Sequence, residues 1–205
     1  MSKQKIALFG GSFDPVHQGH LAVATYAQQV VNLDQVIFIP CAQSPHKLEK
    51  KYTAHEHRTA MLKLATQDLS WAQVSEYELT APQPSYSLNT IEHFKSQYPL
   101  ADLYWIMGED QWRNISSWHE YVRVLKLVTI IVYPRKQSSE KINLTHAQTK
   151  ILAHKNLGID DNCIYLDQAS YLPISSTLIR EKTATSTENL HPQVLKYALN
   201  HQLYL

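Results

Sequence analysis

Short apolar runs separated by helical patterns are the feature of this sequence that most limits its fold. Runs typical of buried strands lie at 5–10, 35–40, 102–107, 127–133 and 163–166, and a more loosely alternating one at 71–79. Helical patterns lie at 19–31, from 53 onward, and at 87–98, 145–157, 175–182 and 192–202. Strands that alternate with such helices form βαβ units. We therefore expect an α/β fold: a Rossmann-like, doubly wound, mainly parallel sheet of five or six strands with helices on both faces.

The length of 205 residues suits one hydrophobic core, and two full domains would be crowded. We expect a single domain over 1–205, with a helical C-terminal part from about 175 to 205. The apolar share of 44% and the charged share of 18% are ordinary for a globular protein. A net charge of +1 predicts no bulk attraction to nucleic acid or to a membrane, so any anion must be bound by locally placed groups.

The cysteines Cys41 and Cys163 stand far apart and outside any CxxC pattern. We expect them to be buried thiols of a reducing compartment. No apolar stretch approaches the ~20 residues of a membrane span, and the polar N-terminus lacks the pattern of a signal peptide. The sequence thus favours the cytoplasm, and it leaves the oligomeric state open, a homo-oligomer included.

Residues 10–20, with the sequence GGSFDPVHQGH, lie between the first expected strand and the first expected helix. Ligands of open α/β sheets bind at the carboxyl ends of strands. Gly10 and Gly11 let the backbone approach a bulky anion closely. His17 and His20 share a face if the helix has begun by His17, and its N-terminus favours phosphate. This segment, the first motif, predicts a phosphate-binding turn.

Two plainer interpretations of the first motif stay open on these residues alone. It could be a glycine-rich turn with a capping histidine, or half of a zinc site, although no third ligand of matching spacing stands nearby. The segment is not GxGxxG and lacks the lysine of a P-loop, so it fits neither of those phosphate-binding patterns.

The first motif resembles the (T/S)FDPxHxGH signature of the HIGH-type nucleotidyltransferase superfamily, and its full form resembles that of bacterial nicotinate mononucleotide adenylyltransferases. The resemblance implies that His17 and His20 contact the phosphates of ATP and stabilise charge on the transferring phosphorus. It further implies an ATP site that includes Gly10, Gly11, Ser12 and Phe13, with Ser12 also close to the acceptor.

Residues 174–180, with the sequence ISSTLIR, form the second motif. Hydroxyl and free N–H groups at a helix start can bind an anion. The same residues are also consistent with a helix that has serine N-caps and a solvated arginine. The stretch resembles the ISSTxIR motif of the same family. That resemblance implies that Ile174, Ser175, Ser176 and Arg180 hold the β- and γ-phosphates, which leave as pyrophosphate.

Further segments resemble the parts of this family that receive the acceptor. Ser44 to Lys47 resembles a PHK loop, which implies that His46 and Lys47 approach the substrate phosphates. Pro84 to Thr90 resembles PSYTxxTL, with Ser87 in the place of a threonine whose hydroxyl and backbone N–H receive the nicotinate carboxylate. Because a carboxylate gains more than an amide from such groups, we expect nicotinate to be preferred over nicotinamide.

The segment from Trp105 to Asp110 resembles (I/F)IGxD, which implies that Gly108 and Asp110 meet the nucleotide. Trp118 matches an aromatic residue that stacks on the pyridine ring. Arg135 matches the arginine of an RPG turn that contacts the acceptor, but the Pro-Gly that should follow is missing here.

These resemblances imply adenylyl transfer from ATP to nicotinate mononucleotide, which gives nicotinate adenine dinucleotide and pyrophosphate in NAD biosynthesis. His17, His20, Lys47 and Arg180 are the expected catalytic residues. No carboxylate cluster suggests a metal site held by the protein, so we expect Mg²⁺ to arrive with ATP. The alternatives are an adenylyltransferase for phosphopantetheine or nicotinamide mononucleotide, a cytidylyltransferase, and a non-catalytic nucleotide-binding relative.

Overall fold

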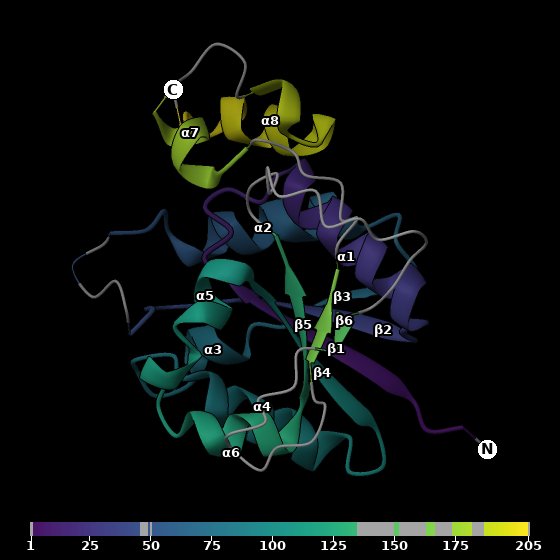
Figure 1. The fold of residues 1–205 in the computed structure, drawn as a ribbon. Helices are drawn as coiled ribbons and strands as arrows, with labels where there is room; N and C mark the ends of the chain where they lie inside the picture. Colours follow the sequence, from purple (N-terminus) through teal and green to yellow (C-terminus); the bar gives the residue numbers. More distant parts are fainter. Residues whose placement is uncertain are drawn as a thin grey trace.

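The chain folds around one seven-stranded sheet in the computed structural model, which describes residues 2–45, 49, 51–134, 150–151, 163–166, 174–181 and 187–204 (Figure 1). The strands are β1 (Lys5–Gly11), β2 (Gln35–Pro40), β3 (Ala72–Val74), β4 (Asp102–Gly108), β5 (Thr129–Tyr133), β6 (Lys150–Ile151) and β7 (Cys163–Tyr165). Their order in the sheet is β3-β2-β1-β4-β5-β7-β6. Every pairing is parallel except that of β6 with β7.

The chain enters the sheet in the middle and winds it in two directions. It runs from β1 outward to β2 and β3, and then returns to the other side of β1 to build β4, β5 and β7. The order therefore reverses between β1 and β4, and ligands of such sheets bind at the carboxyl ends of the strands at this point. The expected doubly wound, mainly parallel sheet is confirmed.

Strand β6 is the part of the sheet that the sequence pattern did not indicate. Lys150 and Ile151 fall inside the 145–157 stretch, for which the pattern predicts a helix, yet they pair with β7 as a short antiparallel edge. Hydrogen bonding to the open edge of β7 outweighs the local helical pattern there, since helix propensity is a weak preference. The rest of that stretch lies outside the described residues.

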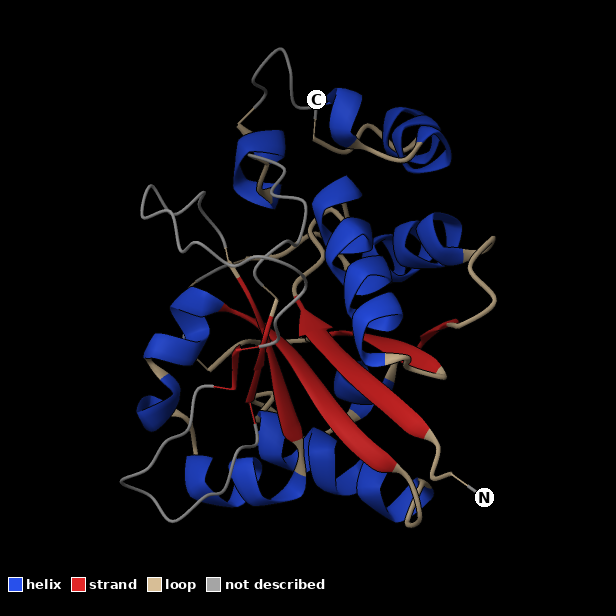
Figure 2. Cartoon of the chain, turned by 45° about the vertical axis from the view of Figure 1, so that its right-hand side comes forward, coloured by secondary structure: helices blue, strands red, loops and turns tan. Residues whose placement is uncertain are grey.

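Helices cover both faces of the sheet (Figures 1 and 2). On one face, α1 (Gln18–Val31), α2 (His55–Thr66) and α8 (Pro192–Asn200) contribute to a core with Ala7 and Phe9 of β1. On the other face, α4 (Ser87–Gln97), α5 (Glu109–Arg113) and α6 (Tyr121–Leu127) pack with Ile6 and Leu8 of the same strand. The short helices α3 (Tyr77–Thr80) and α7 (Ser176–Arg180) and the 3₁₀ turns η1 (Ile115–Ser117) and η3 (Thr187–Asn189) complete the described elements.

Other expectations of the sequence are also tested by the fold. Cys41 and Cys163 are buried free thiols, as expected. Within the described ranges, no helix combines the length and the apolar character that a membrane crossing requires. The stretch 71–79 is not one strand, because β3 ends at Val74 and α3 begins at Tyr77.

Two segments, TAHE at 53–56 and SWHE at 117–120, match the capping-box pattern and predict helix starts at Thr53 and Ser117, but both starts differ in the structure. Helix α2 begins at His55 with Ala54 at the N-cap, because Thr53 is engaged elsewhere: its N–H donates to Asp14 at 3.5 Å and its carbonyl accepts from Arg58 at 2.9 Å. Ser117 ends the turn η1, and α6 begins only after Glu120, whose φ is 46°. The contacts of Thr53 with Asp14 and Arg58 thus override the first capping signal, and the 3₁₀ turn that bonds Ser117 to Asn114 overrides the second.

Candidate active site

The first motif brings its two histidines together at the end of β1. His17 is the N-cap of the fourteen-residue helix α1, in an extended conformation with φ of −144°. Its backbone N–H donates to Nδ1 of His20 at 3.2 Å, and the two ring centroids are 3.8 Å apart. Because Nδ1 of His20 accepts this bond, a neutral His20 carries its proton on Nε2. The sequence-based expectation that the two side chains share a face is confirmed.

Two glycines allow the close packing around these rings. A Cβ atom on Gly19 would lie 3.0 Å from Nδ1 of His17 and 3.2 Å from Ile174 of the second motif. A Cβ atom on Gly10 would lie 3.0 Å from the ring of Trp105. Most real Cβ contacts are longer than this, so a side chain at either position would force its neighbours to shift, and glycine permits the close approach.

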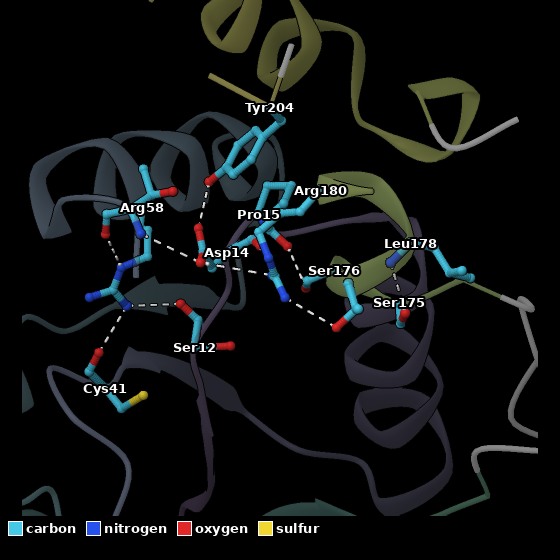
Figure 3. Close-up of polar contacts among 12 residues, drawn as sticks. Ser12, Asp14, Pro15, Cys41, Arg58, Ser175, Ser176, Leu178, Arg180 and Tyr204 are labelled. Carbon is cyan, nitrogen blue, oxygen red and sulfur yellow. Dashed lines mark hydrogen bonds and ion pairs between the residues drawn. The ribbon is translucent and has the colours of Figure 1, made fainter. Parts of the chain in front are cut away.

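The second motif packs directly against the first (Figure 3). Ser176 Oγ donates to the carbonyl of Pro15 at 2.9 Å, and Arg180 donates to the carbonyl of Asp14. The guanidinium of Arg180 also lies 3.8 Å from the Asp14 carboxylate. Ser175 caps α7 by accepting from the N–H of Leu178 at 3.2 Å. Two segments from opposite ends of the sequence thus form one wall.

Asp14 connects this wall to the C-terminal end of the chain. Its side chain is 1% exposed, and it accepts from the hydroxyl of Tyr204 at 2.8 Å as well as from the N–H of Thr53. Burial, chiefly, raises the pKa of Tyr204 far above its ordinary value, so its hydroxyl stays protonated as a donor. Sequence reasoning missed Tyr204, since an isolated tyrosine near a C-terminus carries no signal for this contact.

Arg58 supports the same region through hydrogen bonds to its backbone, and sequence reasoning missed it as well. It is 2% exposed, and its guanidinium donates to the carbonyls of Ser12 and Cys41, both at 2.8 Å, and of Thr53 at 2.9 Å. It therefore holds the chain together just beyond the ends of β1 and β2. The neighbouring Tyr52, whose ring centroid lies 5.4 Å from the guanidinium carbon, has a pKa raised to about 12, mainly by burial, and remains a neutral phenol.

A cleft of about 760 Å³ joins these parts, a size that suits a nucleotide. The predicted residues of the first motif that line it are Gly10, Gly11, Ser12, His17 and His20. Those of the second motif are Ile174, Ser175, Ser176 and Arg180. Ser87 and Trp118, predicted for the acceptor, line the same cleft. The structure therefore brings both motifs together with Ser87 and Trp118, two of the residues predicted for the acceptor, around one space.

The remaining predicted residues lie off the cleft wall or beyond the described chain. Phe13 is 1% exposed beneath the first motif, where its ring packs on His20 with centroids 5.0 Å apart. Gly108 ends β4 and caps α5, and Asp110 is exposed in the first turn of α5. His46, Lys47 and Arg135 are outside the described residues, although their described neighbours Pro45 and Pro134 line the cleft.

The far end of the cleft is formed by the start of α4 and its surroundings. Tyr86 is the N-cap of this eleven-residue helix and Ser87 its first residue. Trp118 is half-buried, and its ring meets Trp105 edge-on with centroids 6.2 Å apart. Glu78, which sequence analysis missed, also lines this end although it is only 4% exposed. Its pKa is raised to about 7 by burial, against the opposing effect of hydrogen bonds from Thr90 and Ser85.

Metal ligands do not cluster in the part of the chain that the structure describes. No group of three or more His, Cys, Asp or Glu side chains there could hold an ion. The carboxylate of Asp14 lies in the turn itself, but Arg180 and Tyr204 already engage it.

Comparisons with known proteins show the family to which the chain belongs. The profile of the cytidylyltransferase-like family matches residues 8–182. Proteins named probable nicotinate-nucleotide adenylyltransferase are similar over nearly the whole chain: that of Methylacidiphilum infernorum is 33% identical, with 98% of this chain and 92% of the relative covered. The Trichormus variabilis relative is 34% identical, with 98% and 97% covered.

A solved structure shares the fold. Plasmodium falciparum nicotinic acid mononucleotide adenylyltransferase, complexed with NaAD, superposes with a TM-score of 0.72 at 18% identity, covering 98% of this chain and 97% of that one. The chain therefore belongs to the cytidylyltransferase-like family and to its nicotinate-nucleotide adenylyltransferases, which are nucleotidyltransferase enzymes.

Proposed function

We propose that this chain transfers the adenylyl group of ATP to nicotinate mononucleotide and releases pyrophosphate. The observation that carries the proposal is the junction of the two motifs, in which Arg180 and Ser176 bond to the backbone of Asp14 and Pro15 beside His17 and His20. A triphosphate needs donors along its whole length, and this junction supplies histidine, hydroxyl and guanidinium groups on one wall. The names of the curated relatives support the same reaction.

The chemistry requires positioning and charge stabilisation rather than a general base. The acceptor phosphate is already ionised near neutral pH, so one of its oxygens attacks the α-phosphorus of ATP directly. The new P–O bond forms as the bond to the β-phosphate oxygen breaks, and pyrophosphate leaves with the electron pair. His17, His20, Lys47 and Arg180 would offset the charge on the reacting oxygens.

Magnesium would enter this site as part of the substrate. We expect Mg²⁺ to come bound to the polyphosphate of ATP, where it neutralises charge on the leaving pyrophosphate. Gly10, Gly11 and Ser12 would contact the nucleotide from the cleft wall, and Gly108 and Asp110 would approach it from the end of β4 and the start of α5. Phe13 would support the ring of His20.

The acceptor would occupy the far end of the cleft. The pyridine ring would lie against Trp118 and its carboxylate would face Ser87 and the first N–H groups of α4. A carboxylate gains roughly 0.3–1 kcal/mol from such a helix start, which a neutral amide does not. His46, Lys47 and Arg135 would approach the phosphates of the substrates.

The decisive experiment supplies the purified chain with Mg²⁺-ATP and nicotinate mononucleotide and measures both dinucleotide and pyrophosphate. Parallel reactions with nicotinamide mononucleotide, with phosphopantetheine, and with CTP in place of ATP test the other transferases. We expect the reaction of Mg²⁺-ATP with nicotinate mononucleotide to be the fastest, and to proceed near neutral pH. A faster reaction with another acceptor or with CTP would replace the proposal, and no pyrophosphate from any pair would indicate a non-catalytic relative.

A further inference from the structure

Glu78 is a buried carboxyl group on the wall of the acceptor end of the cleft. It lies in the short helix α3 and is 4% exposed, yet it lines the cleft together with Ser85, Tyr86 and Ser87. None of the phosphate chemistry described above uses it. A buried carboxyl group beside the predicted place of an anionic ring substituent needs a physical explanation.

The contacts of Glu78 build it into the turn that leads to Ser87. Thr90, in the first turns of α4, donates its hydroxyl to Oε1 of Glu78 at 2.6 Å. The backbone carbonyl of Glu78 accepts from the side-chain amide of Gln83 at 3.0 Å, and the oxygen of that amide accepts from the Ser85 hydroxyl at 3.2 Å. The position of the carboxyl group is therefore fixed relative to the start of α4.

The ionisable groups near Glu78 have other partners. On its own segment, Glu76 pairs with Lys63 at 2.7 Å and Tyr77 stacks on His93 of α4 with centroids 3.8 Å apart. Two further pairs lie on the packed elements. Glu92 of α4 pairs with Arg123, and His119, which also lines the cleft, lies 3.6 Å from Glu120.

Strand β2, which packs on α3, carries no ionisable side chain between Gln35 and Pro40. In the described part of the chain, no ion pair therefore compensates an ionised Glu78. Burial without a compensating cation favours the protonated carboxyl group.

Building on the function proposed above, we propose that Glu78 determines acceptor specificity through its protonation state. A protonated Glu78 tolerates an acceptor whose ring carries a carboxylate. An ionised Glu78 repels that carboxylate and accepts a hydrogen bond from the N–H₂ group of an amide acceptor instead. The preference for acid over amide is then set jointly by Ser87, the start of α4 and the proton on Glu78.

The consequence is a preference that depends on pH. Burial raises the pKa of Glu78 to about 7, so the protonated fraction falls about tenfold between pH 6 and pH 8. The ratio of kcat/KM for nicotinate mononucleotide to kcat/KM for nicotinamide mononucleotide should fall by at least this factor, because the ionised carboxylate that repels the acid also accepts a hydrogen bond from the amide. Both acceptors carry the same phosphate, so the ratio removes the pH dependence of the nucleophile.

The test measures this ratio from pH 6 to pH 8 for the wild type and three variants. Glu78→Gln keeps the shape and loses the charge, so its ratio should not change with pH. Glu76→Gln removes an exposed carboxylate nearby and should leave the wild-type slope intact. Thr90→Val removes the hydrogen bond that favours the ionised form, so the midpoint should move to higher pH. Thr90→Val also provides the test if Glu78→Gln does not fold.

The outcomes separate this proposal from the proposed function. Turnover of both acceptors with a wild-type ratio that does not change with pH would overturn the role of Glu78 alone. So would a Glu78→Gln variant that keeps the wild-type slope. Turnover of neither acceptor would remove the proposed function, and this inference with it.

Discussion

Arg180 donates a hydrogen bond to the backbone carbonyl of Asp14, 166 positions earlier in the sequence, and its guanidinium lies 3.8 Å from the Asp14 carboxylate. The cation expected to hold the leaving phosphates is thus supported by the turn that carries His17 and His20. Because Asp14 also accepts from Tyr204, three distant segments share one buried carboxylate. Disturbing that carboxylate should affect ATP binding before it affects the acceptor.

Tyr204→Phe tests this connection with the removal of a single hydroxyl. A hydrogen bond to a buried charged group contributes about 2 kcal/mol, so the free energy of unfolding should fall by about that amount. The KM for ATP should rise several-fold while the KM for the acceptor stays nearly constant. Tyr197→Phe is the matched control, because it removes a phenol of α8 that bonds to His57 at 3.0 Å and not to Asp14. Equal effects of the two variants on the KM for ATP would contradict the role of Tyr204.

Arg58→Met tests the hydrogen bonds that Arg58 donates just beyond the ends of β1 and β2. The change leaves the carbonyls of Ser12, Cys41 and Thr53 without their donor in a buried site, at a cost of about 3 kcal/mol or more. Arg58→Lys keeps the charge but cannot reach all three carbonyls, so its loss should be intermediate. Urea denaturation measures both. If the free energy of unfolding of Arg58→Met stays within about 1 kcal/mol of the wild-type value, these three hydrogen bonds are not needed for stability.

His20→Ala and His20→Asn separate catalysis from helix capping. Either change removes an imidazole expected to stabilise the reacting phosphates, so kcat should fall roughly 10²–10³-fold in both. Only His20→Ala lacks an acceptor for the backbone N–H of His17, and it should lose about 1 kcal/mol of stability while His20→Asn loses less. Turnover close to the wild-type value in either folded variant would exclude His20 from the chemistry.

Glu78 should also make the free energy of unfolding depend on pH. Its pKa is about 7 in the folded chain against 4.5 for an ordinary glutamate. Between these values the unfolded chain has lost a proton that the folded chain retains, so stability falls as pH rises through this window. Glu78→Gln lacks this loss and should gain on the wild type from pH 4.5 to 7, by on the order of 3 kcal/mol in total. Parallel stability curves for the two proteins from pH 4 to 8 would contradict the raised pKa.

The parts of the site that the sequence predicts are those whose chemistry lies in a contiguous segment. The glycines, His17 and His20 of the first motif and the serines and Arg180 of the second are local patterns, and alternating strands and helices indicate which edge of the sheet carries them. Ser87 and Trp118 were likewise found through local similarity, and both line the cleft.

Residues whose role depends on tertiary contacts could not be predicted in this way. Arg58 resembles an ordinary charged residue of an amphipathic helix until the carbonyls of three other segments surround it. Tyr204 and Glu78 acquire their roles from Asp14 and Thr90, which lie 190 and 12 positions away. Thr53 shows the opposite failure, since a valid local capping pattern is replaced by bonds to Asp14, 39 positions away, and to Arg58.

The most direct test of the central claim is the formation of dinucleotide from Mg²⁺-ATP with each of the two pyridine mononucleotides at pH 6.5. We expect nicotinate adenine dinucleotide and pyrophosphate in equal amounts, with a higher kcat/KM for the acid than for the amide. A higher kcat/KM for nicotinamide mononucleotide, or pyrophosphate released without any dinucleotide, would contradict it.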